Sequence, residues 1–494
     1  MTKKLERSCG ILLHVSSLPS RYGIGSIGRE AHDFVDFLAD AGQTWWQMLP
    51  LSPTGKGNSP YSSVSVFACN PLLIDLEMLA DWGLLTREEL EHAAIGSAGP
   101  VDYEKVAAVK GGFLLLACRR GLSTENGDFR QFCSKEQYWL DDYALFCAIR
   151  KHFNGTPWYE WPEELKRRGP GAVFRMREML RESVDESRFL QFLFFRQWRI
   201  LKKYMEERGI GAIGDIPIYV SYDSSDVWEV PALFQMDDAL RPTAVSGVPP
   251  DYFSAEGQLW NNPLYDWEYH KNTKFAWWLS RMKRNAEFFD AIRIDHFRGL
   301  EAYWSVPYGE ASARNGKWVE GPGKALVDEL KKLEVGIIAE DLGCESEGLV
   351  ELLRYSGFPG MRVLEFAFDT EDGNCPHRPH MYEKNCVAYT GTHDNDTVCG
   401  WLEHADSDAV RRAAEYLGLN EEEGYVRGMM RGVLSSAADL AVIPMQDVMC
   451  LGSACRMNTP SVPEGNWRWR IEEEDYRRKY SAGLYEMARR YGRI

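Results

Sequence analysis

Acidic residues stand at the ends of several short apolar runs of this chain, where they could take part in catalysis. In residues 292–299, which read IRIDHFRG, Arg293 precedes Asp295 by two positions. Side chains alternate along a strand, so these two face the same side, about 6.5 to 7 Å apart along the chain. A cation at that distance favours an ionised carboxylate, which a carboxylate nucleophile requires. The spacing alone nevertheless favours a structural Arg–Asp pair.

A second apolar run, residues 337–343, ends in the adjacent acids Glu340 and Asp341. Neighbours on a strand face opposite sides, so at most one of them points into a given site, and the spacing does not say which. A carboxylic acid beside apolar walls and near another carboxylate has a raised pKa, which suits a general acid. The other acid is then available to cap the following helix, and we expect Asp341 to do so.

A third run, residues 390–397, reads TGTHDNDT and contains His393 and Asp394. Acids and an imidazole at this density are compatible with metal ligands, with a helix N-cap or with acceptors for sugar hydroxyls. This motif alone favours the cap. Three acid-bearing strand ends, together with Asp215 in the GDIP of residues 214–217, favour a site lined by carboxylates.

The elements that must position these acids are short buried strands separated by segments of helical period. Near-continuous apolar runs indicate strands buried on both faces, as in parallel sheets. Carboxylates at several strand ends are typical of a (β/α)8 TIM barrel, an α/β fold that gathers catalytic residues at one face. A doubly wound sheet is the alternative, but it collects ligands at a single switch point. The predicted strands lie in residues 10–15, 45–51, 210–220, 289–295, 335–340, 361–368 and 387–392.

Two intervals interrupt the strand–helix rhythm of what we predict to be one catalytic barrel over residues 1–494. Residues from about 75 to 208 read as charged amphipathic helices, which is too long for one connection and indicates an inserted helical subdomain. Residues from about 221 to 277 are rich in Pro, Trp, Tyr, Asp and Asn with little periodicity. Long ordered loops of this kind are usually lids or binding loops, so we predict long active-site loops here.

Composition and charge restrict the partners. The chain has 494 residues, with 57 Lys and Arg against 73 Asp and Glu. The resulting charge of -16 repels polyanions, so we expect neither nucleic acid nor a membrane as a partner. Eleven cysteines without a CxxC pair argue against a disulfide framework and a structural zinc site, and favour a reducing, cytoplasmic location. The 17 Trp, 23 Tyr and 22 Phe are compatible with a sugar-binding surface, although core packing explains most of them.

Two further motifs have simpler explanations than cofactor binding. Residues 23–28 match GxGxxG, but no strand directly precedes them and the next predicted strand does not end in an acid, so we read a turn that opens a helix. His377 and His380 form an HxxH without a third ligand at a known spacing, which favours a loop pair. We therefore predict no metal and no organic cofactor.

The acidic motifs, together with LLHVSSLP at residues 12–19, SPYSS at 59–63 and GVPPDYF at 247–253, resemble those of amylomaltase. Amylomaltase is the 4-α-glucanotransferase also called disproportionating enzyme, in the α-amylase-like clan of glycoside hydrolases. The resemblance extends from about residue 10 to the NWRWR segment at residues 466–470. The order and spacing of the motifs make it highly specific.

The resemblance implies a role for each matching residue. Asp295 would be the nucleophile, Glu340 the general acid/base and Asp394 the carboxylate that orients the sugar 2- and 3-hydroxyls, which selects Glu340 over Asp341. The residues implied to bind substrate are Asp215, Arg293, His296 and His393 around the sugar, Tyr61 as an aromatic platform, and Gln258, Leu259 and Trp260 in a lid.

One position in the lid departs from the family. The family commonly has Trp-Gly-Asn-Pro where this chain has Trp260-Asn261-Asn262-Pro263. Asparagine tolerates a positive φ better than most residues, so we expect the turn to be kept.

The implied reaction moves α-1,4-glucan segments from a maltooligosaccharide or starch donor to a glucan or glucose acceptor, by a retaining double displacement. Three alternatives remain at this point. A hydrolase of the α-amylase type would use the same acids, a glucan-binding protein would need only the aromatic residues, and a nicotinamide oxidoreductase would depend on GxGxxG alone. The sequence leaves the oligomeric state open.

Overall fold

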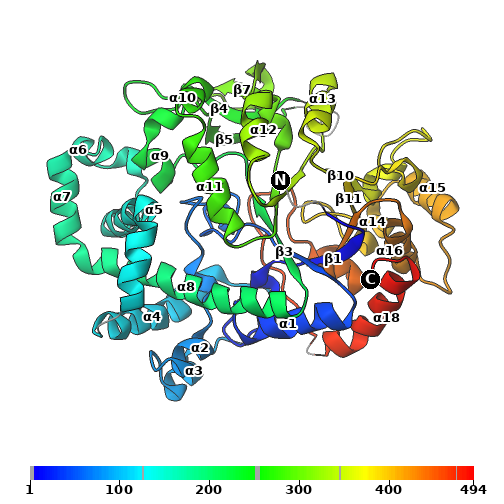
Figure 1. Ribbon diagram of the computed structural model, residues 1–494, viewed down its shortest axis with the longest axis horizontal. Helices are drawn as coiled ribbons and strands as arrows, with labels where there is room; N and C mark the ends of the chain where they lie inside the picture. The colour runs from blue at the N-terminus through cyan, green and yellow to red at the C-terminus, as the bar shows by residue number, and fades with distance from the viewer. Residues whose placement is uncertain (1–4, 125–126, 251–255, 344–345, 474) are drawn as a thin grey trace.

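The computed structural model describes residues 5–124, 127–250, 256–343, 346–473 and 475–494. Its centre is a barrel of eight parallel strands in the order β10-β11-β12-β1-β2-β3-β6-β9 (Figure 1). The N–H of Ala339 donates to the carbonyl of Pro359 at 2.9 Å, which joins the two edge strands. The strands are β1 (Ser8–Leu12), β2 (Trp45–Gln47), β3 (Gly211–Ile216), β6 (Ala291–Ile294), β9 (Gly336–Ala339), β10 (Gly360–Val363), β11 (Cys386–Tyr389) and β12 (Leu440–Pro444).

The predicted barrel is confirmed, and seven of its strands lie within or overlap the seven predicted runs. The eighth, β12, was not predicted. Its apolar run passes directly into the short helix α17 (Met445–Val448), so no turn separates it from helical sequence.

Alternation along the strands decides which residues reach the site. Ile213, Ala291 and Ile338 belong to one apolar cluster shared by the strands, whereas Ile292 and Ile294 pack in the larger core with the surrounding helices. Residues two positions further along a strand keep the same side. The row of side chains inside the barrel that includes Ile213, Ala291 and Ile338 therefore continues at the carboxyl ends of the strands. It continues with Asp215, Arg293 and Glu340.

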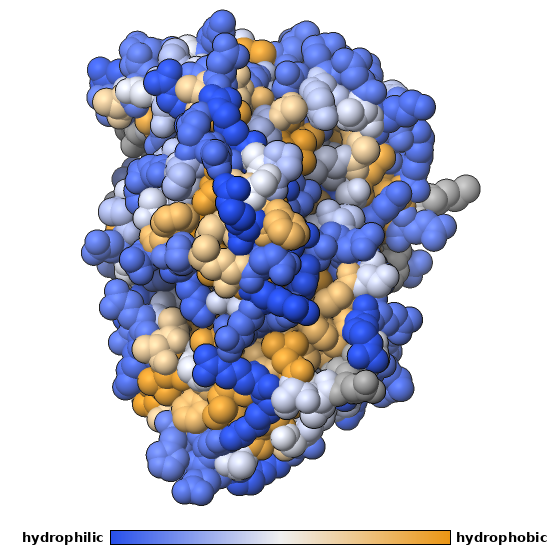
Figure 2. All heavy atoms as spheres, turned by 90° about the vertical axis from the view of Figure 1, so that its left-hand side faces the viewer, coloured by the Kyte–Doolittle hydropathy of each residue, from blue (hydrophilic) through white to orange (hydrophobic). Residues whose placement is uncertain are grey.

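The segment between β2 and β3 is helical, and Figure 1 shows these helices gathered at the left and lower left of the barrel. Two glutamines of α8 attach these helices to the segment that follows β2. The side-chain amide of Gln191 bonds the backbone N–H and carbonyl of Cys69, and that of Gln197 bonds the backbone N–H and carbonyl of Asp75. Figure 2 views this side and shows a mainly hydrophilic surface with smaller hydrophobic areas. The helices are α2 (Leu76–Asp81), α3 (Arg87–Ala93), α4 (Tyr103–Leu122), α5 (Gly127–His152), α6 (Glu163–Lys166), α7 (Pro170–Met179) and α8 (Arg181–Glu207).

Residues 221–277 contain more regular structure than the long loop that we predicted. Strands β4 (Ala244–Val248) and β5 (Gln258–Pro263) form an antiparallel sheet with β7 (Ala302–Pro307) and β8 (Lys317–Glu320), in the order β5-β4-β7-β8. The partners of β4 include a strand beyond residue 300, so local periodicity does not reveal the pairing. The part of the predicted lid at residues 251–255 lies outside the described residues. Helices α9 (Ser225–Glu229) and α10 (Trp267–Asn272) also lie in this segment.

The remaining helices surround the barrel. Near the end of the chain, the buried guanidinium of Arg493 donates to the carbonyls of Leu434 and Ser8. Within the described ranges, no helix is long and apolar enough to cross a membrane. The helices are α1 (Arg29–Asp40), α11 (Ala276–Ala286), α12 (Gly323–Leu330), α13 (Glu347–Ser356), α14 (Val398–His404), α15 (Ser407–Leu417), α16 (Tyr425–Ser435) and α18 (Tyr476–Arg490).

Candidate active site

Three neighbouring strands, β3, β6 and β9, bring the first group of predicted residues together. Asp215 lies at the end of β3, Arg293 and Asp295 at the end of β6, and Glu340 directly after β9. Because these strands are hydrogen-bonded neighbours in the barrel, their carboxyl ends lie side by side. The barrel therefore collects acids that are up to 125 positions apart in the sequence.

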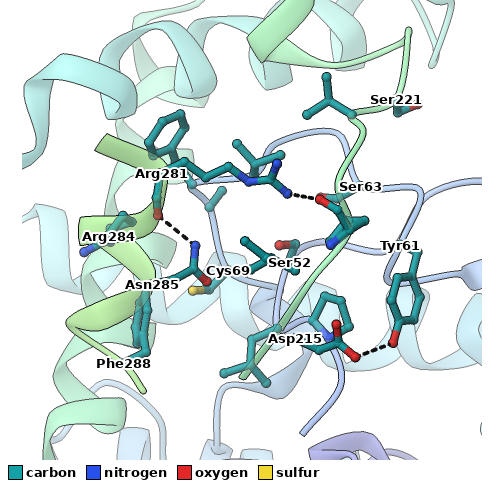
Figure 3. A pocket seen from close by; sticks show the side chains of 18 of the residues that line it. Ser52, Tyr61, Ser63, Cys69, Asp215, Ser221, Arg281, Arg284, Asn285 and Phe288 are labelled. Carbon is teal, nitrogen blue, oxygen red and sulfur yellow. Dashed lines mark hydrogen bonds between the residues drawn. The ribbon is translucent and has the colours of Figure 1, made fainter. Parts of the chain in front are cut away.

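Arg293 is the centre of this group. Its buried Nη1 donates to both carboxylate oxygens of Asp215, at 2.8 and 2.7 Å, and to Oδ1 of Asp295 at 2.9 Å. Although burial opposes it, the charges of Asp215 and Asp295 raise the pKa of Arg293. The hydroxyl of Tyr61 donates to Oδ2 of Asp215 at 2.9 Å (Figure 3). Asp215 thus fixes the guanidinium, and the guanidinium fixes Asp295.

Asp295 is the member of the group that reaches the open cleft. Its side chain is 28% exposed, whereas that of Asp215 is fully buried. Burial raises the pKa of Asp215, and the charge of Arg293 opposes that shift. His296 follows in the left-handed conformation, with φ of 51°. Burial lowers the pKa of His296 to about 4, so its ring is neutral at pH 7.

Glu340 is buried beside Asp295 and is held by backbone donors. Its Oε2 accepts from the N–H of His296 at 2.6 Å, and its Oε1 accepts from the N–H of Leu342 at 2.8 Å. Burial raises the pKa of Glu340 to about 8; Arg293 opposes this shift, and the charge of Asp295 adds to it. A carboxyl group that stays protonated at neutral pH beside a nucleophile has the property of a general acid.

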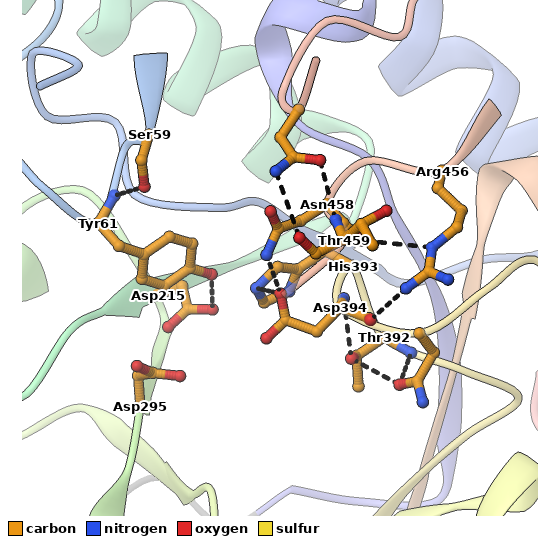
Figure 4. A network of polar contacts seen from close by, with 12 residues as sticks. Ser59, Tyr61, Asp215, Asp295, Thr392, His393, Asp394, Arg456, Asn458 and Thr459 are labelled. Atoms are coloured by element: carbon orange, nitrogen blue, oxygen red, sulfur yellow. Dashed lines mark hydrogen bonds and ion pairs between the residues drawn. The ribbon is translucent and has the colours of Figure 1, made fainter. Parts of the chain in front are cut away.

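Asp394 lies on a loop after β11, near Tyr61 and His393 (Figure 4). Its side chain is 45% exposed, and its Oδ1 accepts from Nδ2 of Asn458 at 2.6 Å. The ring of His393 lies beside this carboxylate, with Nε2 at 3.4 Å, and stacks on the ring of Tyr61 with centroids 5.2 Å apart. Tyr61 therefore bonds Asp215 through its hydroxyl and contacts the Asp394 loop through its ring.

A cleft of about 590 Å³, a size that suits an oligosaccharide segment, is lined by Tyr61, Asp295, His393 and Asp394. The buried Asp215, Arg293 and Glu340 are not among its lining residues. Strand β5, which carries the predicted lid residues, contributes Gln258 and Trp260, and the indole Nε1 of Trp260 donates to Oε1 of Gln258 at 3.1 Å. The Trp260 ring stands edge-on to the ring of His296, with centroids 4.8 Å apart. Asn261 has a φ of 61°, so it adopts the positive φ that asparagine tolerates, within strand β5 rather than in the turn that we expected. The lid residue Leu259 also lines the cleft.

Sequence reasoning did not assign several residues of the cleft. Asn458 and Trp467 come from a segment after β12, and Tyr219 follows β3. The segment contains neither acids at a strand end nor a helical period, so it lacked the pattern that identified the other residues. Its only signal was the NWRWR motif at residues 466–470, where the resemblance ends.

One prediction near the site was wrong. Asp341 does not cap the following helix, because the N-cap of α13 is Ser346. Instead, its Oδ1 accepts from the N–H of Met361 at 2.6 Å and its Oδ2 lies 3.1 Å from Arg362. Asp341 follows Glu340 along the chain and faces the opposite side, away from the interior of the barrel. There the hydrogen-bond donors come from β10 and not from the helix.

The histidines of the HxxH motif bond to protein groups. Nδ1 of His377 accepts from the N–H of Val363 at 3.1 Å. The ring of His380 bonds the hydroxyl of Tyr416. Across the described part of the chain, no group of three or more His, Cys, Asp or Glu side chains is arranged to hold a metal ion.

The chain is similar to proteins of known activity. The family model for 4-alpha-glucanotransferase matches residues 13–475. A 4-alpha-glucanotransferase of Clostridium butyricum is 46% identical and covers 97% of this chain and 100% of its own length. One from Thermus thermophilus is 44% identical, covering 98% of this chain and 99% of its own. The structure of amylomaltase from Streptococcus agalactiae in complex with acarbose has a TM-score of 0.96 and 37% identity, covering 99% of this chain and 100% of that one.

Proposed function

The chain belongs to the 4-alpha-glucanotransferase family, and we propose that it transfers glucan segments by a retaining double displacement at Asp295 and Glu340. The transferase activity follows from relatives that match over their full length. The assignment of the acids is supported by one observation above all: a single guanidinium nitrogen bridges Asp215 and Asp295, next to a glutamic acid whose pKa is about 8.

In the first step, Asp295 attacks the anomeric carbon of the donor sugar. The hydrogen bond from Arg293 engages Oδ1 of Asp295, and the other oxygen forms the ester bond as the glycosidic C–O bond breaks. The proton of Glu340 goes to the leaving oxygen. The products are a covalent glycosyl-enzyme and a shortened glucan with a free 4-hydroxyl.

In the second step, Glu340 acts as the base. Formation of the ester removes the negative charge of Asp295, which is one of the causes that raise the pKa of Glu340. The pKa of Glu340 therefore falls, and its carboxylate can take the proton of the incoming acceptor hydroxyl. The acceptor oxygen displaces Asp295, and the anomeric configuration is retained.

Transfer exceeds hydrolysis only when the acceptor sugar reaches the intermediate more effectively than water does. Trp260 lies against His296, the residue next to Asp295, so a sugar stacked on this indole would lie close to the ester. Such positioning supplies a high effective concentration of acceptor, and a closed lid excludes water. We assign this role to the lid strand Gln258–Pro263.

We assign Asp394 to the donor sugar, where its carboxylate accepts hydrogen bonds from the 2- and 3-hydroxyls. His393 stacks on Tyr61 and lies beside Asp394, so Tyr61 and Asp394 can contact the same sugar ring. We infer maltooligosaccharides or starch as donors and a glucan or glucose as the acceptor. No step requires a metal or cofactor. The ten described cysteines are all unpaired, which suits a reducing location such as the cytosol.

The experiment that tests the function is product analysis with maltotriose as the only substrate. Each bond broken is remade, so glucose and a ladder of longer maltooligosaccharides should form while the number of reducing ends stays nearly constant. Reducing ends that rise in step with substrate loss would instead identify a hydrolase of the α-amylase type.

A further inference from the structure

Asp394 differs from the other acids of the site in how it is held. Asp215 and Glu340 lie at or directly after barrel strands and are buried, whereas Asp394 lies on a loop and is 45% exposed. A carboxylate in that position has no strand to fix its direction. Its orientation depends on what contacts the loop.

The contacts come from residues 453–458, a segment that follows β12. Asn458 holds the carboxylate through Nδ2 at 2.6 Å, and its own N–H donates to the carbonyl of His393 at 3.1 Å. Arg456 holds the main chain, since its Nη2 donates to the carbonyl of Asp394 at 2.8 Å (Figure 4). Residues 453–458 therefore form hydrogen bonds with both the side chain and the backbone of Asp394.

The segment is itself anchored on the far side of the loop. Oγ of Ser453 donates to Oδ2 of Asp396 at 2.7 Å, and Nη1 of Arg456 lies 3.9 Å from the same oxygen. A Cβ at Gly400 would lie 2.1 Å from Oγ of Ser453, so the absence of a side chain there permits this close approach. The loop carrying Asp394 is thus enclosed between α14 and residues 453–458.

We propose that Asn458 is a positioning residue for catalysis, which directs the carboxylate of Asp394 toward the sugar hydroxyls, with Arg456 fixing the backbone beneath it. This inference rests on the proposed role of Asp394. A charge-assisted hydrogen bond at 2.6 Å restricts one carboxylate oxygen and so determines where the other points. Hydrogen bonds to the sugar 2-hydroxyl strengthen in the transition state. Misdirecting Asp394 should therefore lower kcat more than it raises KM.

The test is a double-mutant cycle of Asn458→Ala and Asp394→Asn, measured as transfer from maltotriose. Asn458→Ala should lower kcat roughly tenfold to a hundredfold, the range for a hydrogen bond to a charged group, with KM changed by less than about threefold. If Asn458 acts through Asp394, the double variant should be no slower than Asp394→Asn alone. Additive losses would show that Asn458 contacts the sugar itself and would overturn the proposal.

A second variant guards against a simple loss of structure. Asn458→Asp has nearly the same shape but places an acceptor against Asp394, so its loss should exceed that of Asn458→Ala, and Asp394→Asn should remove the excess. An Asn458→Asp enzyme as fast as Asn458→Ala would contradict the contact. Asn420→Ala, the same change on an exposed loop, is the matched control and should leave transfer unchanged.

Arg456→Lys should recover part of the activity lost in Arg456→Met.

The outcome separates this inference from the proposed function. If Asp394→Asn keeps full activity, the role of Asp394 is wrong and the inference falls with it. If Asp394→Asn is inactive while Asn458→Ala keeps its full kcat, only the inference fails.

Discussion

The two walls of the catalytic cleft are built differently. The strand wall consists of Asp295, which lines the cleft, and of the buried residues that accompany it, Asp215, Arg293 and Glu340. All four lie at or just after the ends of β3, β6 and β9. The loop wall consists of Asp394, Asn458 and Trp260, which lie on a loop, a late segment and the lid strand. Most of the strand wall is buried, and one guanidinium joins two of its acids. The loop wall is partly exposed and is held by hydrogen bonds and ring contacts between segments.

The difference separates two tasks. Breaking and forming bonds needs acids whose position and pKa are fixed, and a barrel strand supplies both rigidity and burial. Binding and releasing long glucans needs groups that can open to solvent, which loops supply. Changes in the strand wall should therefore abolish chemistry or stability. In the loop wall, changes at Asp394 and Asn458 should lower kcat, and changes at Trp260 should redistribute products.

The largest effect is expected for the two acids that we propose to react. Asp295→Asn should lower transfer by more than about 10⁴-fold, because an amide in place of the carboxylate cannot form the ester. Glu340→Gln should be equally impaired on maltotriose but should still react with a glycosyl fluoride, whose leaving group needs no proton. Steady-state rates on both donors check this. Full activity of either variant on maltotriose would show that different acids perform the reaction.

Removal of the bridging guanidinium should cost stability as well as activity. Arg293→Met leaves the fully buried Asp215 carboxylate without its cation, so the free energy of unfolding should fall by about 3 kcal/mol. Adding Asp215→Asn should restore part of that loss. Urea denaturation measures both. An unchanged unfolding midpoint in Arg293→Met would mean that the strand wall is not held by this bridge.

The pH dependence should report the raised pKa of Glu340. The first step needs its proton, so kcat/KM should fall about tenfold per pH unit above pH 8. The folded-state pKa lies above the ordinary 4.5, so the folded protein binds this proton more tightly than the unfolded chain does. The contribution of Glu340 therefore makes stability fall as the pH rises from about 4.5 to about 8.

Glu340→Gln should remove that part of the slope, which chemical denaturation at several pH values detects. An alkaline limb of kcat/KM centred near pH 10 would contradict the assignment.

The smallest of these effects is expected in the loop wall. Trp260→Ala should raise the ratio of hydrolysis to transfer severalfold, because loss of a stacking contact costs about 1 kcal/mol of acceptor binding. Donor consumption should fall less than this ratio rises. Comparison of reducing ends with total oligosaccharide from maltotriose measures both quantities. An unchanged ratio would remove Trp260 from the explanation of transfer.

The strand wall was largely predictable from the sequence, and the loop wall was predictable only in part, at Asp394. Acids at the ends of apolar runs identified Asp215, Asp295 and Glu340 as candidates before any resemblance was considered. The choice between Glu340 and Asp341 needed one more fact, namely which face of β9 is inner, because Ile338 and Glu340 share it. The same rule identified Asp394, and the resemblance identified Trp260, but neither applies to Asn458. Asn458 reaches Asp394 across 64 positions through a segment without regular period.

The fold shows the same limit. Local periodicity found seven of the eight barrel strands, but it missed β12, which runs straight into a helix. It also missed the antiparallel sheet of the lid, because β4 pairs with a strand about 60 residues later and pairing at that distance leaves no local pattern.

The central claim is that Asp295 forms a covalent bond to the sugar, and trapping tests it most directly. Glu340→Gln treated with a maltosyl fluoride should accumulate the ester, because the first step proceeds without a proton donor and the second lacks its base. Peptide mass spectrometry should then find the added maltosyl mass on the peptide that contains Asp295. An adduct on another residue, or release of a product with inverted anomeric configuration and no adduct, would contradict the account.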